Sequence, residues 1–223
     1  NDPLLPDQWH YVNNVDLSVA ETSRAGADIN VKNAWKLCAG DPKVIVAVCD
    51  EGVKYNHPDL IDNMWVNVDE IPDNGIDDDK NGYVDDIHGW NFLSTTDYPK
   101  EIGWAAEGDK GHGTHVAGTV AAVNHNGIGV GGVAGGSGKG DGVKIMSCQV
   151  FSGNSSATVA SRAKAYEYAA NNGACILQCS FGLSGGMLTS DGAFDLSYGV
   201  EKVGLDYFFN YRQPYSPVDK NFA

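Results

Sequence analysis

Positive charge and long apolar runs are both scarce in this sequence. Lysine and arginine number 15 among 223 residues, against 29 aspartates and glutamates, which gives a formal net charge of −14. A chain this acidic repels phosphate backbones, so a nucleic acid is disfavoured as a partner. The longest purely apolar run, residues 44–49, is far shorter than the roughly 20 residues of a membrane helix, so no membrane span is expected.

Paired cysteines and a leader segment are missing as well. The five cysteines have none of the paired spacings of a metal site, and four of them lie in apolar runs, where a free cysteine usually packs as a small core residue. Residues 1–3 lack the charged and apolar regions of a signal peptide, so we expect any such peptide to have been removed already. Hydrophobic residues make up 42% of the chain, a share that excludes disorder and a collagen-like repeat.

Three short apolar segments, rich in β-branched residues, have the pattern of strands buried on both faces. They are residues 43–49, 143–151 and 174–179. Two helical patterns lie between them, at residues 112–123 and 158–172, and a glycine closes the second. This alternation predicts an α/β fold with a parallel sheet and right-handed crossovers.

We expect residues 1–223 to form a single domain in which residues 1–40 are an irregular lead-in that ends in a short helix near residues 29–38. Residues 127–142 are dense in glycine, and a Gly-x-Gly-x-x-Gly-like string within them raises the alternative of a nucleotide-binding domain. A dinucleotide site needs that string directly after a strand and at the start of a helix. Here the string follows a helix and leads into a strand, so we interpret the glycines as a turn-rich connection.

Asp50 and His112 are the candidate catalytic residues. Asp50 follows the first predicted strand, and ligands of open parallel sheets bind outside the carboxyl ends of strands. An aspartate there can also be a plain helix cap or turn former. His112 lies between two glycines at the start of a predicted helix, where a substrate backbone can approach closely. Zinc proteases place two histidines four residues apart around a glutamate, so His112 and His115 do not fit a zinc site. We expect His115 to pack or hydrogen-bond internally.

An aspartate at a strand end followed by a histidine at a helix start supplies two members of a Ser-His-Asp triad. Three strings resemble the subtilisin-like serine proteases (subtilases, peptidase family S8): Gly-His-Gly-Thr-His-Val-Ala-Gly-Thr at residues 111–119, Val-Cys-Asp-Glu-Gly-Val at residues 48–53, and His-Pro-Asp-Leu at residues 57–60. Residues 176–182 are similar to the third strand of that family and its Ser-Leu-Gly stretch. The resemblance covers residues 43–182 and implies a three-layer α/β fold with a mostly parallel sheet flanked by helices.

By that resemblance Asp50 orients the histidine, and His112 is the general base and later the acid for the leaving amine. The resemblance also implies two edges between which a peptide substrate lies as an added β-strand. They are Ser155, Ser156 and Ala157 on one side and Ser180, Phe181 and Gly182 on the other. The first edge departs from the family's usual glycines, which bears on fine specificity. Glu51 stands where the family usually has serine or threonine, and its carboxylate either favours the protonated histidine or points to solvent.

Residues 69–86 carry eight acidic residues and one lysine, a charge of −7 that is half of the total. Their oxygen-bearing side chains alternate and a glycine stands at the sharp turn, as in the first half of an EF-hand loop, but His88 stands where the bidentate glutamate of an EF-hand belongs. We expect this insert, residues 69–88, to bind one structural Ca²⁺, because the clustered charges repel one another unless a cation screens them. The alternative is a solvated acidic loop. The predicted ligands are Asp77, Asp79, Asn81, the Tyr83 carbonyl and Asp85 or Asp86.

The resemblance implies a second structural Ca²⁺ site. Its ligands would come from the His-Pro-Asp-Leu string and from the loop after the histidine helix, with a glutamine of the lead-in completing the set. The implied residues are Asp59, Val123, Asn126, Ile128, Val130 and Gln8. Calcium bound only by the folded chain adds stability by mass action.

The family's nucleophile lies in a Gly-Thr-Ser-Met-Ala string, and its oxyanion-hole asparagine follows a later strand; neither occurs in this sequence. We therefore expect the N-terminal part of a longer catalytic domain, incomplete at its C-terminus. The favoured function is a secreted, cell-surface or periplasmic serine endopeptidase that acts on polypeptides and needs the C-terminal part of its own domain as a partner. The alternative is an inactive homologue or truncated fragment that serves as a calcium-stabilised peptide-binding or structural domain.

Overall fold

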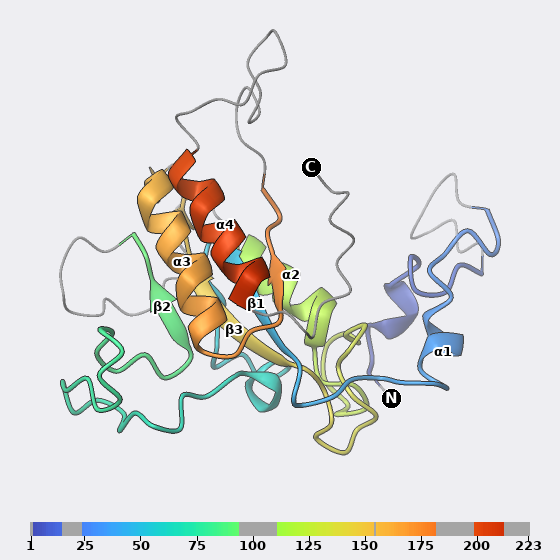
Figure 1. Ribbon diagram of the computed structural model, residues 1–223. Helices are drawn as coiled ribbons and strands as arrows, with labels where there is room; N and C mark the ends of the chain where they lie inside the picture. The colour runs from blue at the N-terminus through green and yellow to red at the C-terminus, as the bar shows by residue number, and fades with distance from the viewer. Residues whose placement is uncertain (1, 15–23, 94–110, 154, 182–198, 212–223) are drawn as a thin grey trace, which may run out of the picture. The chain divides into compact units, whose positions relative to one another are not determined.

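A four-stranded sheet forms the centre of the fold, in the order β2-β3-β1-β6 (Figure 1). The computed structural model describes residues 2–14, 24–93, 111–153, 155–181 and 199–211. The strands are β1 (Ile45–Asp50), β2 (Gly89–Asn91), β3 (Lys144–Gln149) and β6 (Ile176–Gln178). β1 pairs with β6 and β2 with β3, both in parallel. The parallel sheet with flanking helices confirms the predicted α/β class.

The helices are α1 (Val31–Ala34), α2 (His112–Ala121), α3 (Val159–Asn171) and α4 (Gly199–Tyr211), with short 3-10 turns at Leu5–Asp7 and Ile61–Asn63. A two-stranded antiparallel sheet joins β4 (Phe151–Ser152) to β5 (Ser155–Ser156). The three predicted strands and both predicted long helices are therefore confirmed. The sequence patterns did not predict β2 or α4.

The contacts divide the chain into two units that interleave in sequence. One comprises Asn1–Val44, Tyr55–Met64 and His115–Ile145, and the other Ile45–Lys54, Trp65–Thr114 and Met146–Ala223. In the first unit Tyr11 is fully buried, stacks edge-on against Trp35, and donates its hydroxyl to the Thr119 carbonyl at 3.0 Å. This packing anchors the irregular lead-in within its own unit.

The second unit has an apolar core between the sheet and the helices α3 and α4, which lie side by side (Figure 1). Ala47 and Cys49 of β1 belong to this core together with Tyr166 and Ala169 of α3. Because alternate strand residues face the same side of a sheet, these positions leave the next residue, Asp50, for the opposite face. None of the helices described is both long and apolar enough to cross a bilayer.

Candidate active site

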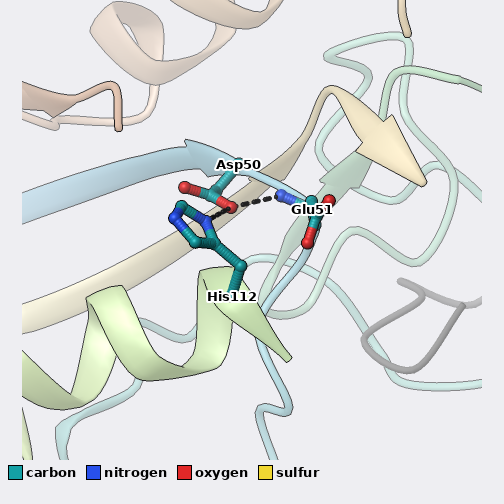
Figure 2. A group of neighbouring side chains, drawn as sticks. All are labelled: Asp50, Glu51 and His112. Atoms are coloured by element: carbon teal, nitrogen blue, oxygen red, sulfur yellow. Dashed lines mark hydrogen bonds and ion pairs between the residues drawn. The ribbon is translucent and has the colours of Figure 1, made fainter. Parts of the chain in front are cut away.

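The two candidate catalytic side chains meet at the end of β1. Asp50 is the last residue of that strand and His112 is the first residue of α2. The imidazole Nδ1 lies 2.7 Å from Asp50 Oδ1 (Figure 2). The Asp50 side chain is only 2% exposed, whereas that of His112 is 51% exposed. A buried carboxylate therefore holds one nitrogen of a ring whose body is open to solvent.

Hydrogen bonds fix the backbone at Asp50 and in the turn that follows it. The Asp50 carbonyl accepts from the Val150 N–H at 2.8 Å. The turn after β1 is held by the Val53 N–H, which donates to Ser147 Oγ at 3.1 Å. One residue further, the Lys54 N–H donates to Thr114 Oγ1 at 3.0 Å, which ties this turn to the first turn of α2. The distance between the carboxylate and the imidazole is thus set by ordered backbone.

Gly113 allows α2 to begin this close to the strand. A Cβ at residue 113 would lie 2.3 Å from the Gly52 carbonyl oxygen and 3.2 Å from Asp50 Oδ1. The first of these separations is shorter than any contact that a real side chain makes. The close approach of Asp50 and His112 therefore requires a glycine at position 113.

Glu51 belongs to the same cluster. Its backbone N–H donates to Asp50 Oδ1 at 2.8 Å, so one carboxylate oxygen accepts from both Glu51 and the imidazole (Figure 2). Asp50, Glu51 and His112 each offer a ligand atom within 4.8 Å of the other two. One oxygen of the Glu51 carboxylate, Oε2, is buried, so this side chain does not simply point to solvent.

The two predicted substrate edges follow β4 and β6. Ser155 and Ser156 form β5, and the Ala157 N–H donates to the Val150 carbonyl at 2.7 Å. On the other edge Ser180 Oγ accepts from Gln178 Nε2 at 2.9 Å. Phe151 of β4 packs edge-on against Phe181 of the second edge, with ring centroids 4.7 Å apart. Gly182 lies outside the described residues.

The acidic insert folds around a glutamate that the sequence patterns did not single out. Glu70 accepts from the backbone N–H groups of Asp78 and Asp79 through Oε1, and from that of Asp85 through Oε2. Glu70, Asp77 and Asp79 each offer an oxygen within 4.8 Å of the other two. The Asn81 N–H donates to Oδ1 of both aspartates. The structure thus brings Asp77, Asp79 and Asn81 together and adds Glu70 to the predicted ligands.

The other two aspartates that were predicted as ligands, Asp85 and Asp86, have other partners. Asp85 accepts from the backbone N–H groups of Asn74 and Gly75. Asp86 is buried and accepts from the Tyr168 hydroxyl at 2.6 Å and from the Asn67 and Asn81 amides. Burial raises the pKa of Asp86 to about 6, with the hydrogen bonds opposing the shift. The Tyr83 ring packs edge-on against Trp90 and Tyr168.

The residues implied for a second metal site also come together. Asp59 is 2% exposed, and its carboxylate accepts from the Asn126 amide at 2.7 Å and from the Val130 N–H at 3.0 Å. Its carbonyl accepts from the Val123 N–H. Gln8 exchanges two hydrogen bonds with the Gly131 backbone, and the Ile128 N–H donates to Asn126 Oδ1. Burial raises the pKa of Asp59, so a nearby cation would relieve the cost of keeping it ionised.

Comparison with known proteins places this geometry in one family. Residues 41–203 match the model of the Subtilase family, peptidase S8. The chain is 33% identical over 182 residues to Subtilisin-like protease 1 of Plasmodium vivax, covering 81% of this chain and 25% of that protein. It is 36% identical over 163 residues to Subtilisin-like protease 1 of Plasmodium falciparum (isolate 3D7), covering 73% of this chain and 20% of that protein.

A solved serine protease of Aeromonas sobria has the same fold. Its TM-score is 0.60 at 25% identity, and the match covers 94% of this chain and 29% of that one. The chain thus spans about a quarter of the length of the curated relatives it matches. Family model, relatives and fold agree: the chain belongs to the subtilase family of serine proteases.

Proposed function

We propose that this chain is part of a serine endopeptidase and supplies the aspartate and the histidine of its Asp-His-Ser triad. The observation that carries the proposal is the 2.7 Å hydrogen bond between buried Asp50 Oδ1 and His112 Nδ1. A purely structural or peptide-binding domain has no need of this pair. The nucleophilic serine is supplied by a segment outside these 223 residues, since the family's Gly-Thr-Ser-Met-Ala string is not among them.

The chemistry of the two residues follows from the hydrogen bond between them. Asp50 accepts from Nδ1 and so fixes the tautomer in which Nε2 takes a proton from the serine. After proton transfer the imidazolium is stabilised by the Asp50 carboxylate, with the Glu51 charge adding to it. The ring then returns the proton to the leaving amine, and a water molecule repeats the cycle on the acyl group.

The substrate class is a polypeptide bound in extended form. The segments 155–157 and 180–181 present backbone next to the Asp50–His112 end of the sheet, and an extended peptide adds to such backbone as a further strand. Serines and an alanine stand on the first edge in place of the family's usual glycines, and this departure bears on fine specificity.

We further propose that the fold binds one or two structural Ca²⁺ ions. At the acidic insert Glu70, Asp77 and Asp79 offer hard oxygen ligands, which are those that Ca²⁺ prefers. At the second position a buried carboxylate of raised pKa, Asp59, lies next to the Asn126 side chain. Millimolar calcium is found outside cells, so we propose that the protein acts as a secreted or surface-exposed enzyme.

The endopeptidase proposal is tested with a fluorophosphonate that labels activated serines. The purified protein is incubated with the probe, resolved on a denaturing gel and measured by intact mass. We expect label on a co-purifying C-terminal polypeptide or segment and none on residues 1–223. Asp50→Asn should slow labelling by about 10⁴-fold, and His112→Ala should slow it by more. The control is His115→Ala. The sequence predicted that this side chain packs or hydrogen-bonds internally, but it is exposed, and it lies outside the Asp50–His112 pair.

Absence of any labelled serine polypeptide, together with binding of a peptide by the chain, would instead support the alternative of a calcium-stabilised peptide-binding domain without hydrolysis. In that case His112→Ala and Asp50→Asn should leave peptide binding unchanged. The two outcomes are exclusive, because covalent labelling requires a serine that the Asp50–His112 pair activates.

A further inference from the structure

One arginine near the start of α3 binds the first predicted substrate edge, Ser155–Ala157. The Arg162 Nη1 donates to the Ala157 carbonyl at 2.8 Å and to Ser156 Oγ at 3.3 Å. Ser156 Oγ in turn donates to the same carbonyl at 3.2 Å. Long side chains of a helix project back toward its N-terminus, which brings this guanidinium to the residues that precede α3. The edge and the helix are therefore tied together by one side chain.

The guanidinium is taken out of water to make these bonds. Arg162 is 6% exposed, and within the part of the chain that the structure describes it is the one lysine or arginine that is buried. A buried charge costs free energy unless it is hydrogen-bonded, and bonds from a charged donor are stronger than those between neutral groups. The bonds to Ser156 and Ala157 offset part of that cost.

The edge needs an anchor because its own strands are very short. β4 and β5 have two residues each, Phe151–Ser152 and Ser155–Ser156. An isolated two-stranded hairpin is marginally stable at best in water. Ala157, directly after β5, is buried and has both backbone groups bound: its N–H donates to the Val150 carbonyl, and its carbonyl accepts from Arg162. The arginine thus supplies one of the two bonds that hold the end of this edge.

We propose that Arg162 is a positioning residue for substrate binding, which fixes the Ser155–Ala157 edge in the extended form to which a polypeptide adds. The inference rests on the proposed endopeptidase function and adds a residue to it. Ser156 is exposed beside the anchored Ala157, so a bound peptide meets it directly. An edge that is ordered in advance spares the complex the cost of ordering it on binding. Arg162 would then raise the affinity for peptides without touching the reacting atoms.

The location of Arg162 separates this role from that of the catalytic pair. Asp50 and His112 are joined by their own hydrogen bond. The bonds that hold the turn after Asp50 reach β3 through Ser147 and α2 through Thr114, and neither passes through α3. Loss of the Arg162 contacts should therefore change the affinity for a peptide and leave the chemical step intact.

The test compares two substrates in the complete protease, which contains this chain and the segment with the nucleophilic serine. One is a peptide long enough to lie along both edges, and the other is a single-residue ester that reaches only the catalytic pair. Arg162→Met keeps a long buried stem and removes every donor. We expect KM for the peptide to rise about 10-fold and kcat to stay within about 2-fold, because a bond from a charged donor is lost. Ester hydrolysis and fluorophosphonate labelling should be unchanged.

Lys164→Met is the matched control, because Lys164 lies on the same helix and carries the same charge but is exposed. It should leave the kinetics of both substrates unchanged. Arg162→Lys is the second variant, and it keeps the test decisive if Arg162→Met fails to fold. It retains the charge and a donor but not the planar fork, so KM for the peptide should rise only about 3-fold.

An unchanged KM for the peptide in the folded Arg162 variants would overturn the proposal. Equal losses for the ester and the peptide would overturn it too, because that pattern indicates a general loss of structure. In either case labelling of the unaltered protease leaves the endopeptidase function standing. If the unaltered protease is not labelled at all, the endopeptidase function fails, and the role of Arg162 fails with it.

Discussion

Gly113 lies at the closest approach of the two candidate catalytic residues. We expect Gly113→Ala to push the start of α2 away from β1, because the new methyl would lie 2.3 Å from the Gly52 carbonyl oxygen. Overpacking of this kind costs about 1–3 kcal/mol of unfolding free energy. It should also slow fluorophosphonate labelling by lengthening the Asp50–His112 hydrogen bond. Urea unfolding and labelling rates measure the two effects.

Gly118 provides the matched control within the same helix. A Cβ at residue 118 would have nothing within 4 Å, and Gly118 is not among the residues of positive φ. Gly118→Ala should therefore leave labelling unchanged and raise stability by about 0.5–1 kcal/mol, through helix propensity. Equal effects of the two substitutions would show that the helix as a whole, rather than its contact with β1, responds to the change.

Tyr11 gives the protein a specific sensitivity to alkaline pH. Burial raises the pKa of Tyr11 to about 12, against about 10 in the unfolded chain. The folded state thus binds the proton more tightly, so its stability is complete below pH 10 and falls as pH rises toward 12, by roughly 2 kcal/mol. Tyr11→Phe should cost about 1 kcal/mol at pH 7, through the lost bond to Thr119, and should lose less stability above pH 10.

Unfolding by urea at pH 8 and pH 11 measures this difference. Tyr207→Phe is the control: Tyr207 also donates its hydroxyl, to Asn171 Oδ1, but its side chain is exposed. If Tyr11→Phe and Tyr207→Phe change alkaline stability alike, the buried hydroxyl of Tyr11 is not the cause.

The candidate site residues that the sequence alone could identify lie within continuous sequence motifs. Asp50 and His112 each lie inside a continuous string, and the first is marked further by the strand before it. Glu70 could not be found in this way, because it reaches Asp77 and Asp79 only after the chain has turned back through backbone hydrogen bonds at residues 78, 79 and 85. Its role depends on the shape of the loop and not on spacing.

Helix α3 depends on one capping residue at its start. Thr158 has extended backbone, and its Oγ1 accepts from the Ser161 N–H at 3.1 Å. This bond satisfies one of the N–H groups that the first turn leaves without an intrahelical partner. We expect Thr158→Ala to cost about 1 kcal/mol of unfolding free energy, measured by thermal or urea unfolding.

Thr158→Ser keeps the hydroxyl and should restore nearly all of this stability. A serine variant as unstable as the alanine one would indicate that the methyl group of Thr158, and not the cap, is what matters.

Among the helices and strands, the sequence predicted those that are long and have a clear hydrophobic pattern. β1 and β3 each have six residues with apolar side chains on both faces, and the sequence predicted both. β2 is only Gly-Trp-Asn, and it forms because it pairs with β3, which is a tertiary effect. α4 was missed because its apolar residues, such as Phe208, acquire a clear role only against α3 and the core.

The charge of the whole molecule is the property that calcium would change most. Half of the net charge of −14 lies in residues 69–86, where the carboxylates of Glu70, Asp77 and Asp79 converge. Repulsion among these groups opposes folding unless a cation offsets it. The candidate positions lie in different units, the insert in one and Asp59 in the other, so each can be examined by its own variant.

Removal of calcium should therefore lower the thermal midpoint of the protein. A site occupied at 100 times its dissociation constant adds about 2.7 kcal/mol, which corresponds to a shift of about 5–10 °C for a chain of this size. The measurement is the midpoint in calcium and in chelator, recorded for the unaltered protein, Asp77→Asn and Asp59→Asn. Each variant should lose the part of the calcium-dependent shift that its site contributes, and the double variant should lose all of it.

Magnesium at the same concentration is the control for general screening of charge, since its preference for short, octahedral coordination suits a loop of several carboxylates less well. If the midpoint is the same in calcium and chelator, or if magnesium restores it fully, the acidic insert is a solvated loop and the calcium proposal fails.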